Sequence, residues 1–260
     1  MEHTGTVERK NALKLNLYTQ KVRINIWYAS FSVEINDSLP EKTIIKSAVG
    51  IDVGINPIVA LSNKDKKEPP KFLLQSEHKL GREERKLSRK QIGSHNRNKP
   101  RIKVAKIHRH IRRQRADFHQ KLSKELVTKY DFIAFEDLKI KNMMKNHHLA
   151  KSISDVSWNM LQSFTAYKAE WDGKVVTFVN PKNTSQECSM CGRIVRKNLN
   201  IKIHHCPYCG LVLDRHVNAA INILHRGLKK VGLGYTDFMP VRGPAQDRPM
   251  TQEVHDFNRG

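Results

Sequence analysis

The stretch Cys188-Ser-Met-Cys191, followed after fourteen residues by Cys206-Pro-Tyr-Cys209, holds all four cysteines of the 260-residue chain. Two such pairs are typical of a tetrahedral zinc site with four thiolates at about 2.3 Å from the ion. Gly192 and Gly210 follow the pairs and permit a tight turn after each. Redox or haem chemistry would need only one pair in another setting. The sequence therefore predicts a structural zinc ribbon over residues 183–210.

The spacer of fourteen residues is just under the usual ribbon range, yet it is long enough for a β-hairpin between the pairs. His204 and His205 lie beside the third cysteine. Because four sulfurs already complete a zinc site, these histidines are expected at the surface or against nucleic acid.

Downstream of the cysteines comes Asp214-Arg-His-Val-Asn-Ala-Ala-Ile-Asn-Ile223. Its apolar spacing predicts a helix from Val217 to Leu228 that ends near Gly227. Residues 231–260 are rich in glycine, proline and polar residues, so we expect a flexible tail.

Upstream, two apolar runs carry acids. Residues 47–54 and 58–62 are split by an Ile-Asn-Pro turn and predict a β-hairpin with Asp52 in its first strand. Residues 131–138 predict a short buried strand that contains Glu136. A buried carboxylate needs a partner such as a metal ion. Taken singly, Asp52 also fits a turn residue, and Glu136 fits an ordinary acid at a strand end.

Adjacent strands of one sheet could bring Asp52 and Glu136 together although 84 residues separate them. Two acids plus a third would hold a pair of Mg²⁺ ions about 3.5 to 4 Å apart. One ion would activate water, and the other would stabilise the leaving oxygen in phosphodiester hydrolysis.

The positive charge concentrates in residues 78–130, which contain 18 Lys/Arg and four acids out of 47 basic and 25 acidic residues in the chain. Apolar residues recur there at helical spacing, at Ile107, Ile111, Phe118, Leu122 and Leu126. A shorter helix near Leu80 and Leu87 precedes a polar turn that ends at Pro100. The pattern predicts a helical hairpin with an apolar seam and a cationic outer face. An ordinary solvated helix pair is the simpler alternative, but charges this dense repel one another unless an anion binds.

Such a charge makes a nucleic acid the natural partner, because neutralised phosphates release counterions. The predicted contact residues lie on the second helix: Arg109, Arg112, Arg113 and Arg115. No window approaches the roughly 20 apolar residues of a membrane-spanning helix. The N-terminus also lacks the layout of a signal peptide. Paired cysteines without an export signal indicate the reducing cytoplasm.

The remaining segments are interpreted by their patterns. Residues 23–35 form a strand-like run, and two or three strands fit within residues 1–47. Residues 139–154 are polar and predict a loop. Helical spacing runs from Asp155 to Asp172, and residues 175–181 predict a strand.

Four motifs together resemble the transposon-encoded TnpB (OrfB) family, whose relatives include the type V CRISPR effector nucleases. They occur in the family's order over residues 47–232: Gly50-Ile-Asp-Val-Gly-Ile-Asn, Phe135-Glu-Asp-Leu, Asn180-Pro-Lys-Asn-Thr-Ser-Gln-Glu-Cys, and Cys206-Pro-Tyr-Cys-Gly with the Asp214 motif. The resemblance implies an RNase H-like (RuvC) α/β fold with a mixed sheet and an inserted zinc ribbon. Characterised members are RNA-guided DNA endonucleases, commonly described as transposases.

The resemblance implies site residues and partners as well. Asp52 and Glu136 would be the first and second catalytic carboxylates and would bind Mg²⁺ or Mn²⁺. DNA and a guide RNA would be the partners, and the protein would be cytoplasmic and associated with the nucleoid. The implied organisation is an N-terminal β remnant (1–47), a nuclease core (48–182) with the basic hairpin, the zinc ribbon (183–210), the final motif (211–230) and the tail.

The chain departs from the family pattern at its third carboxylate. The family has an aspartate two residues before the asparagine of the Asn218-Ala-Ala step, and this chain has His216. Imidazole is a poor ligand for Mg²⁺ and removes a negative charge. Asp214 would point elsewhere, because two residues rotate a helical side chain by about 200°, so we expect it to cap the helix. We also expect a shortened N-terminal region, since 49 residues precede Gly50.

Three functions follow. The favoured one is a nucleic-acid-binding member of the family with impaired cleavage. An active RNA-guided endonuclease is the alternative. A zinc-ribbon transcription or translation factor is the distant third, and the Asp52, Glu136 and Asn-Ala-Ala motifs count against it.

Overall fold

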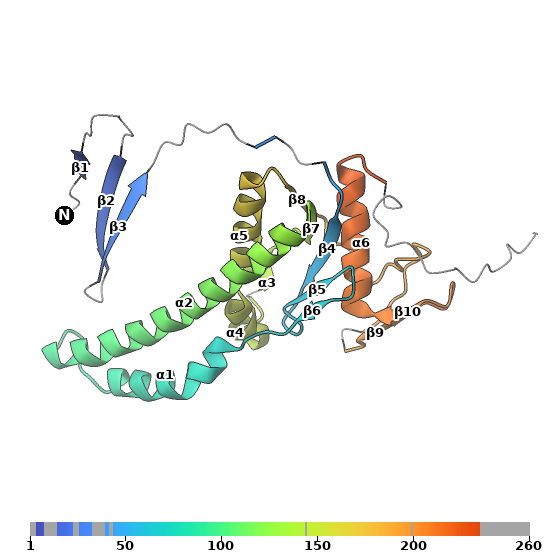
Figure 1. The fold of residues 1–260 in the computed structure, drawn as a ribbon. Coiled ribbons are helices and arrows are strands. Elements are labelled where there is room, and N and C mark those ends of the chain that lie inside the picture. Colours follow the sequence, from blue (N-terminus) through green and yellow to red (C-terminus); the bar gives the residue numbers. More distant parts are fainter. Residues whose placement is uncertain are drawn as a thin grey trace, which may run out of the picture.

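The computed structural model describes residues 4–7, 15–22, 26–32, 40–41, 44–143, 145–198 and 200–234. Its centre is a mixed five-stranded sheet (Figure 1), in the order β6 (Lys66–Lys67), β5 (Val59–Leu61), β4 (Ala48–Val53), β7 (Phe132–Glu136) and β8 (Val175–Val179). β4 runs antiparallel to β5 and parallel to β7, and β7 runs parallel to β8. The predicted hairpin of β4 and β5 and the predicted strands at β7 and β8 are confirmed.

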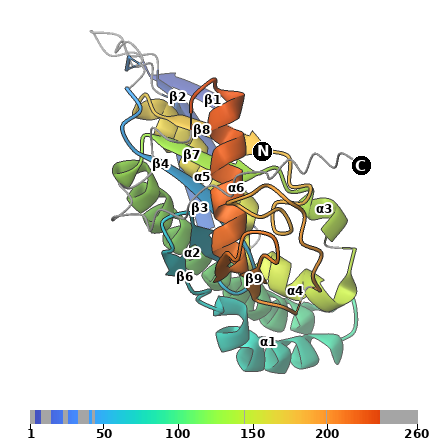
Figure 2. The same ribbon diagram turned by 90° about the vertical axis from the view of Figure 1, so that its right-hand side faces the viewer.

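The sheet is covered on both faces, and α6 (Arg215–Lys230) packs directly on one of them (Figure 2). Ile223, Leu224 and Leu228 of α6 form an apolar cluster with Phe132 and other strand residues. The approach is close, because a Cβ on Gly50 would lie 2.0 Å from the carbonyl oxygen of Ala220. Glycine in β4 therefore lets the helix backbone touch the strand backbone.

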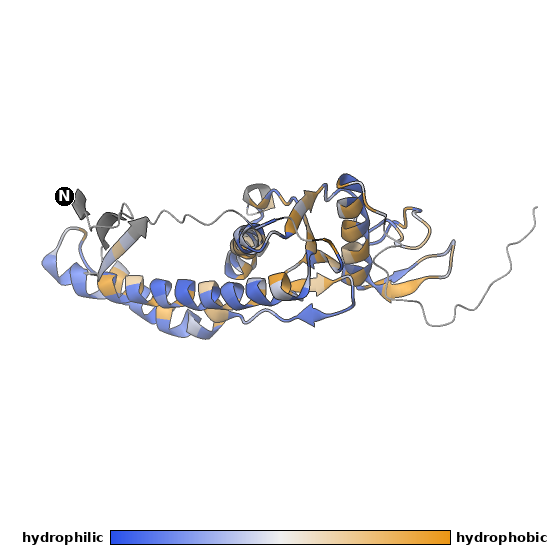
Figure 3. Cartoon of the chain, turned by 45° about the horizontal axis from the view of Figure 1, so that its top comes forward, coloured by the Kyte–Doolittle hydropathy of each residue, from blue (hydrophilic) through white to orange (hydrophobic). Residues whose placement is uncertain are grey.

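The opposite face holds the larger apolar core, to which α2 (Asn98–Lys129) and α5 (Trp158–Trp171) contribute. α1 (Phe72–Ser88) pairs with α2 through a smaller cluster around Leu80, Ile107 and Ile111. The predicted helical hairpin is confirmed. The predicted apolar stripe along α2 is confirmed as well, although its member Phe118 is only half-buried. A single turn, η1 (His95–Arg97), joins the helices. Figure 3 shows the hairpin hydrophilic over most of its surface.

α2 begins at Asn98, slightly before the predicted end of the turn at Pro100. Proline is tolerated in the first turn of a helix, because its missing N–H would have no intrahelical partner there.

The predicted loop over residues 139–154 is wrong. Two helices, α3 (Ile140–Met143) and α4 (His147–Val156), lie there. α4 is amphipathic, and it buries Ile153 and Val156 in the core while exposing polar residues. The next helix begins at Trp158 instead of Asp155, because Ser157 has a positive φ of 50° that interrupts the helical path.

The N-terminal strands β1 (Thr4–Val7), β2 (Leu15–Val22) and β3 (Ile26–Ser32) form a separate antiparallel sheet, as expected for two or three strands. The guanidinium of Arg109 in α2 lies 5.7 Å from the ring centroid of Tyr28 in β3. Most of the predicted tail, residues 235–260, lies outside the described residues. None of the described helices is long and apolar enough to cross a membrane.

Candidate metal centre and carboxylate site

The structure places the two predicted acids side by side. β4 and β7 are parallel with Ile51 opposite Phe135, so Asp52 and Glu136 are the next residues on neighbouring strands. Equal positions on adjacent strands share a face. This is the face that α6 covers, and both acids are buried, with 9% and 6% of their surface exposed.

Burial changes the proton affinity of both acids. It is the main reason that the pKa of Glu136 is raised to about 7, and the negative charge of Asp52 adds to the effect. Burial also raises the pKa of Asp52, although its hydrogen bond to His216 opposes the change. Neighbouring buried acids of this kind are stabilised in their charged form by a cation.

His216 points at Asp52 from the start of α6, and its Nδ1 lies 2.7 Å from Asp52 Oδ2. Its Nε2 lies 3.2 Å from a terminal nitrogen of Arg215. Because a guanidinium can only donate, Nε2 accepts this hydrogen bond and Nδ1 donates to Asp52. The imidazole thus occupies one oxygen of the first acid.

Asp214 caps α6, as predicted. Its carboxylate accepts hydrogen bonds from the backbone N–H groups of His216 at 2.9 Å and Val217 at 3.2 Å. The other oxygen lies 2.7 Å from Lys66 Nζ. Both carboxylate oxygens of Asp214 are therefore already engaged, one by the helix cap and the other by Lys66.

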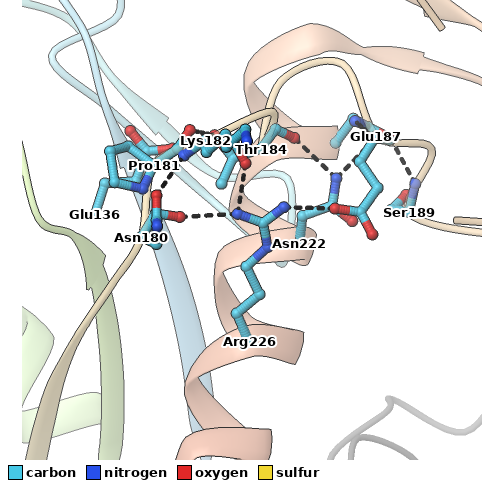
Figure 4. A network of polar contacts seen from close by, with 10 residues as sticks. Glu136, Asn180, Pro181, Lys182, Thr184, Glu187, Ser189, Asn222 and Arg226 are labelled. Atoms are coloured by element: carbon cyan, nitrogen blue, oxygen red, sulfur yellow. Dashed lines mark hydrogen bonds and ion pairs between the residues drawn. The ribbon is translucent and has the colours of Figure 1, made fainter. Parts of the chain in front are cut away.

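Sequence reasoning did not identify the residues that hold Glu136 in place. The hydroxyl of Thr184 contacts the Glu136 carboxylate, and Gln162 Nε2 donates to the Glu136 carbonyl at 3.1 Å. Asn222 Nδ2 in turn donates to the carbonyls of Thr184 at 2.8 Å and Glu187 at 2.7 Å (Figure 4). The signal was available, since Thr184 lies in the Asn180 motif and Asn222 lies in the Asn-Ala-Ala-Ile-Asn motif.

Arg226 completes this network from the next turn of α6. It donates to the carbonyls of Asn180 at 2.8 Å and Lys182 at 2.7 Å, and it pairs with Glu187 Oε2 at 2.5 Å (Figure 4). The segment that links β8 to the first cysteine pair is therefore fixed to α6 at several points.

The four cysteines come together at one point. All four sulfurs lie within 4.8 Å of one another, and the Cys188–Cys209 and Cys191–Cys206 pairs are each 3.6 Å apart. A disulfide would need about 2.05 Å. Four sulfurs at about 2.3 Å from a central ion would be about 3.8 Å apart, so the cluster fits a tetrahedral metal such as zinc.

In the described residues, paired strand segments flank each cysteine pair. β9 (Ile203–His205) and β10 (Val212–Asp214) enclose the second pair, and a bridge between Glu187 and Ile194 encloses the first. Each pair thus forms the turn of its own small hairpin, with a left-handed glycine (Gly192 or Gly210) after its second cysteine.

The predicted surface position of His204 is also wrong. His204 is fully buried, and its Nδ1 lies 2.6 Å from Lys197 Nζ, whereas His205 is exposed. Alternation along β9 explains the difference, because consecutive strand residues point to opposite faces.

The four predicted arginines of α2 do not share one surface. Arg112 and Arg113 are exposed, and Arg109 stacks on Tyr28. Arg115 forms an ion pair with Asp155 Oδ1 at 2.6 Å and is mostly buried, which leaves it little free surface; its contact with nucleic acid stays a prediction. Asp155 also accepts the backbone N–H of Leu73, so this ion pair joins α1, α2 and α4.

Comparison with known proteins agrees with this architecture. A family model described as "Probable transposase" matches residues 30–147, and the model "Cas12f1-like, TNB domain" matches residues 158–223. The chain is 39% identical over 214 residues to a protein of Streptomyces pristinaespiralis named "Putative RNA-guided DNA endonuclease". It is 33% identical over 217 residues to InsQ of Escherichia coli, which has the same name.

These alignments cover 82% and 77% of this chain but only 52% and 54% of the relatives, so the chain spans about half their length. A cryo-EM structure of a CRISPR-Cas12f ternary complex matches 82% of this chain and 46% of that protein, with 19% identity and a TM-score of 0.52. This last likeness shows the fold.

Fold and site together define a mixed α/β protein with two neighbouring buried acids on its central sheet and a cluster of four cysteines that could hold a metal such as zinc. The chain belongs to the TnpB (OrfB) family of transposon-associated proteins, and the order of its motifs along the chain is the family's own.

Proposed function

We propose that this chain is a nucleic-acid-binding member of the RNA-guided DNA endonuclease family whose cleavage step is impaired. The observation that carries the proposal is the contact between His216 Nδ1 and Asp52 Oδ2 beside Glu136. Asp52 and Glu136 would ligate Mg²⁺ or Mn²⁺ on an RNase H-like sheet of the RuvC type, and the third ligand position carries an imidazole.

The imidazole weakens such a site in two ways. Mg²⁺ prefers oxygen ligands, and His216 supplies a nitrogen and no negative charge. In addition, the Nδ1–H group occupies an oxygen of Asp52 that would otherwise face the ion. Two metal ions stabilise the charge of the attacking and leaving oxygens, so a weakened site slows the chemical step most.

The partners follow from the family and the charge. The relatives are named as RNA-guided DNA endonucleases, which supports a guide RNA and DNA as the partners of this chain. Residues 48–182 would form the nuclease core, residues 183–210 the zinc ribbon and residues 211–230 the final motif. Arg112 and Arg113, exposed on the basic hairpin, would contact a nucleic-acid backbone.

The test is cleavage of a guided DNA target with Mg²⁺ or Mn²⁺ by the native chain and by His216→Asp. Restoring several kcal/mol of charge stabilisation should raise the rate by about a hundredfold or more. His216→Asp combined with Asp52→Asn is the control and should remove the gain. Rapid cleavage by the native chain, unchanged by His216→Asp, would favour the alternative of an active endonuclease, which the intact Asp52 and Glu136 pair supports.

A further inference from the structure

A groove of about 520 Å³ lies between α1 and α2, away from the carboxylate site. Basic side chains line it from both helices, namely Lys79 and Arg82 from α1 and Lys103, Lys106 and His110 from α2. Its floor is the apolar contact of the two helices around Ile107. The groove is therefore a concave, cationic surface on an apolar base.

The positive charge in this groove is offset only in part within the described part of the chain. Glu83 is the single acid among the residues that line it, and its Oε1 is already 2.8 Å from Lys86 Nζ and 3.7 Å from Arg82 Nε. Lys79, Lys103 and Lys106 form no ion pair with any described residue. Like charges gathered in a concave surface attract a polyanion strongly.

We propose that this groove grips the phosphodiester backbone of a nucleic acid, with phosphates held between Lys79 on one wall and Lys103 and Lys106 on the other. The inference rests on the proposed nucleic-acid-binding function and assigns it a site. The described lining contains no Phe, Tyr or Trp on which a base could stack. Recognition is therefore by charge and shape, independent of base sequence.

The position of these lysines on α2 separates them from the exposed arginines. Nine residues turn a helix by about 900°, so Arg112 lies on the side opposite Lys103. Arg101 is two residues before Lys103 and is turned from it by about 200°. Arg101 on α2 and Arg85 on α1 are both exposed and do not line the groove, so they provide a matched pair of charges outside it.

The experiment measures fluorescence anisotropy of a labelled single-stranded RNA, a DNA strand of the same sequence and their hybrid duplex, each over a series of salt concentrations. The double variant Lys103→Gln/Lys106→Gln should reduce the slope of log affinity against log salt by about 1.4 on a single strand. Arg85→Gln/Arg101→Gln removes the same charge from exposed residues that do not line the groove, and it should leave the slope close to that of the native chain. The nucleic acid whose slope changes is the occupant of the groove.

Equal reductions of the slope by the lysine and the arginine double variants would overturn the proposed role of the groove, since they would indicate diffuse attraction to the whole hairpin. A reduction by the arginine double variant alone would place the contact outside the groove. Both outcomes leave the proposed function intact. Failure of the native chain to bind any of the three nucleic acids would instead refute the proposed function itself. Thermal unfolding of each variant shows that the hairpin is still folded.

Discussion

At the scale of single residues, His216 and Asp52 decide what the carboxylate site can hold. The 2.7 Å contact gives Asp52 a hydrogen-bond donor in a position where a third acid would supply negative charge. The same contact lowers the pKa of Asp52 and so opposes the rise that burial causes, although burial has the larger effect. An acid in place of His216 would remove this donor and put a second negative charge beside Asp52.

His216→Asp should therefore bind Mn²⁺ more tightly and be less stable without it. A third carboxylate adds a charged oxygen ligand, so we expect at least about a tenfold gain in affinity, or about 1.4 kcal/mol. Isothermal titration calorimetry with MnCl₂ measures the affinity of each variant. His216→Asn, which is neutral and can still donate, is the matched control and should show no gain. Equal affinities of the aspartate and asparagine variants would contradict the assigned role of His216.

Thr184 is the second residue whose effect can be predicted. Its buried hydroxyl contacts the Glu136 carboxylate, so Thr184→Val keeps the shape and leaves the acid without that partner. Loss of such a contact lowers the free energy of unfolding by about 1 to 3 kcal/mol. Urea unfolding at pH 8 should show this loss, and Thr184→Ser should restore most of it. Thr177→Val is the control, since the Thr177 hydroxyl makes no hydrogen bond to any described residue, and it should change stability little.

At the scale of helices and strands, the sequence predicted elements with a strong period. The stripe from Ile107 to Leu126 and the apolar strands β4 and β7 could be read because apolar residues cover one face or the whole segment. α4 was missed although Leu149, Ile153 and Val156 recur at helical spacing, because three large apolar positions in ten residues are a short signal among polar neighbours. Element type depends on periodicity, and short amphipathic helices give little of it.

Part of the candidate site could be predicted in the same way. Two apolar runs predict the strands β4 and β7, so the meeting of Asp52 and Glu136 on adjacent strands could be predicted. The partners of Arg115 and His204 could not, because they depend on tertiary contacts with Asp155 and Lys197. From the sequence alone, a charged side chain in a basic helix is expected to be exposed, because its buried partner belongs to a distant segment.

His119 should make the packing of α2 against α4 sensitive to acid. Its ring is 1% exposed, Nε2 donates to the Val156 carbonyl at 2.9 Å, and the buried Nδ1 has no partner among the described residues. Burial lowers its pKa from the ordinary 6.5. The unfolded chain therefore takes up a proton below about pH 6.5 while the folded chain does not, and stability falls by up to about 1.4 kcal/mol per pH unit.

The measurement is the free energy of unfolding in urea between pH 8 and pH 5. His119→Gln should be less stable at pH 8 but should lose less stability on acidification than the native chain. His110→Gln changes an exposed histidine on the same helix and should follow the native curve. If the native chain and His119→Gln lose stability in parallel, His119 is not the group that takes up the proton.

At the scale of the whole molecule, the chain separates its charges by function. The net charge of +22 is concentrated on the helical hairpin, whereas the central sheet carries the buried acids. Figures 1 and 3 show the hairpin extending from the sheet as a mostly hydrophilic arm. A polyanion held along that arm would meet the acids only at the sheet, where a divalent cation offsets the repulsion between phosphate and carboxylate.

The ribbon and the sheet should also differ in their need for metal. Several large apolar side chains of the ribbon are exposed, among them Met190, Ile203, Tyr208 and Val212. With so little buried surface, the ribbon depends on the ion for its fold. Chelation of zinc should therefore abolish the amide protection of β9 and β10, while β4 and β7 stay protected within their own core.

Hydrogen exchange measured by mass spectrometry, before and after chelation, tests this directly. Thr184 and Glu187 connect the ribbon to Glu136 and to Asn222, so residues 183–187 should lose protection together with the ribbon. Reconstitution with Co²⁺ should restore protection and give the thiolate absorption of a four-sulfur site. Unchanged exchange over residues 183–210 after complete removal of metal would show that contacts with α6 alone hold the ribbon. Loss of protection in β4 as well would show that ribbon and sheet unfold as one unit.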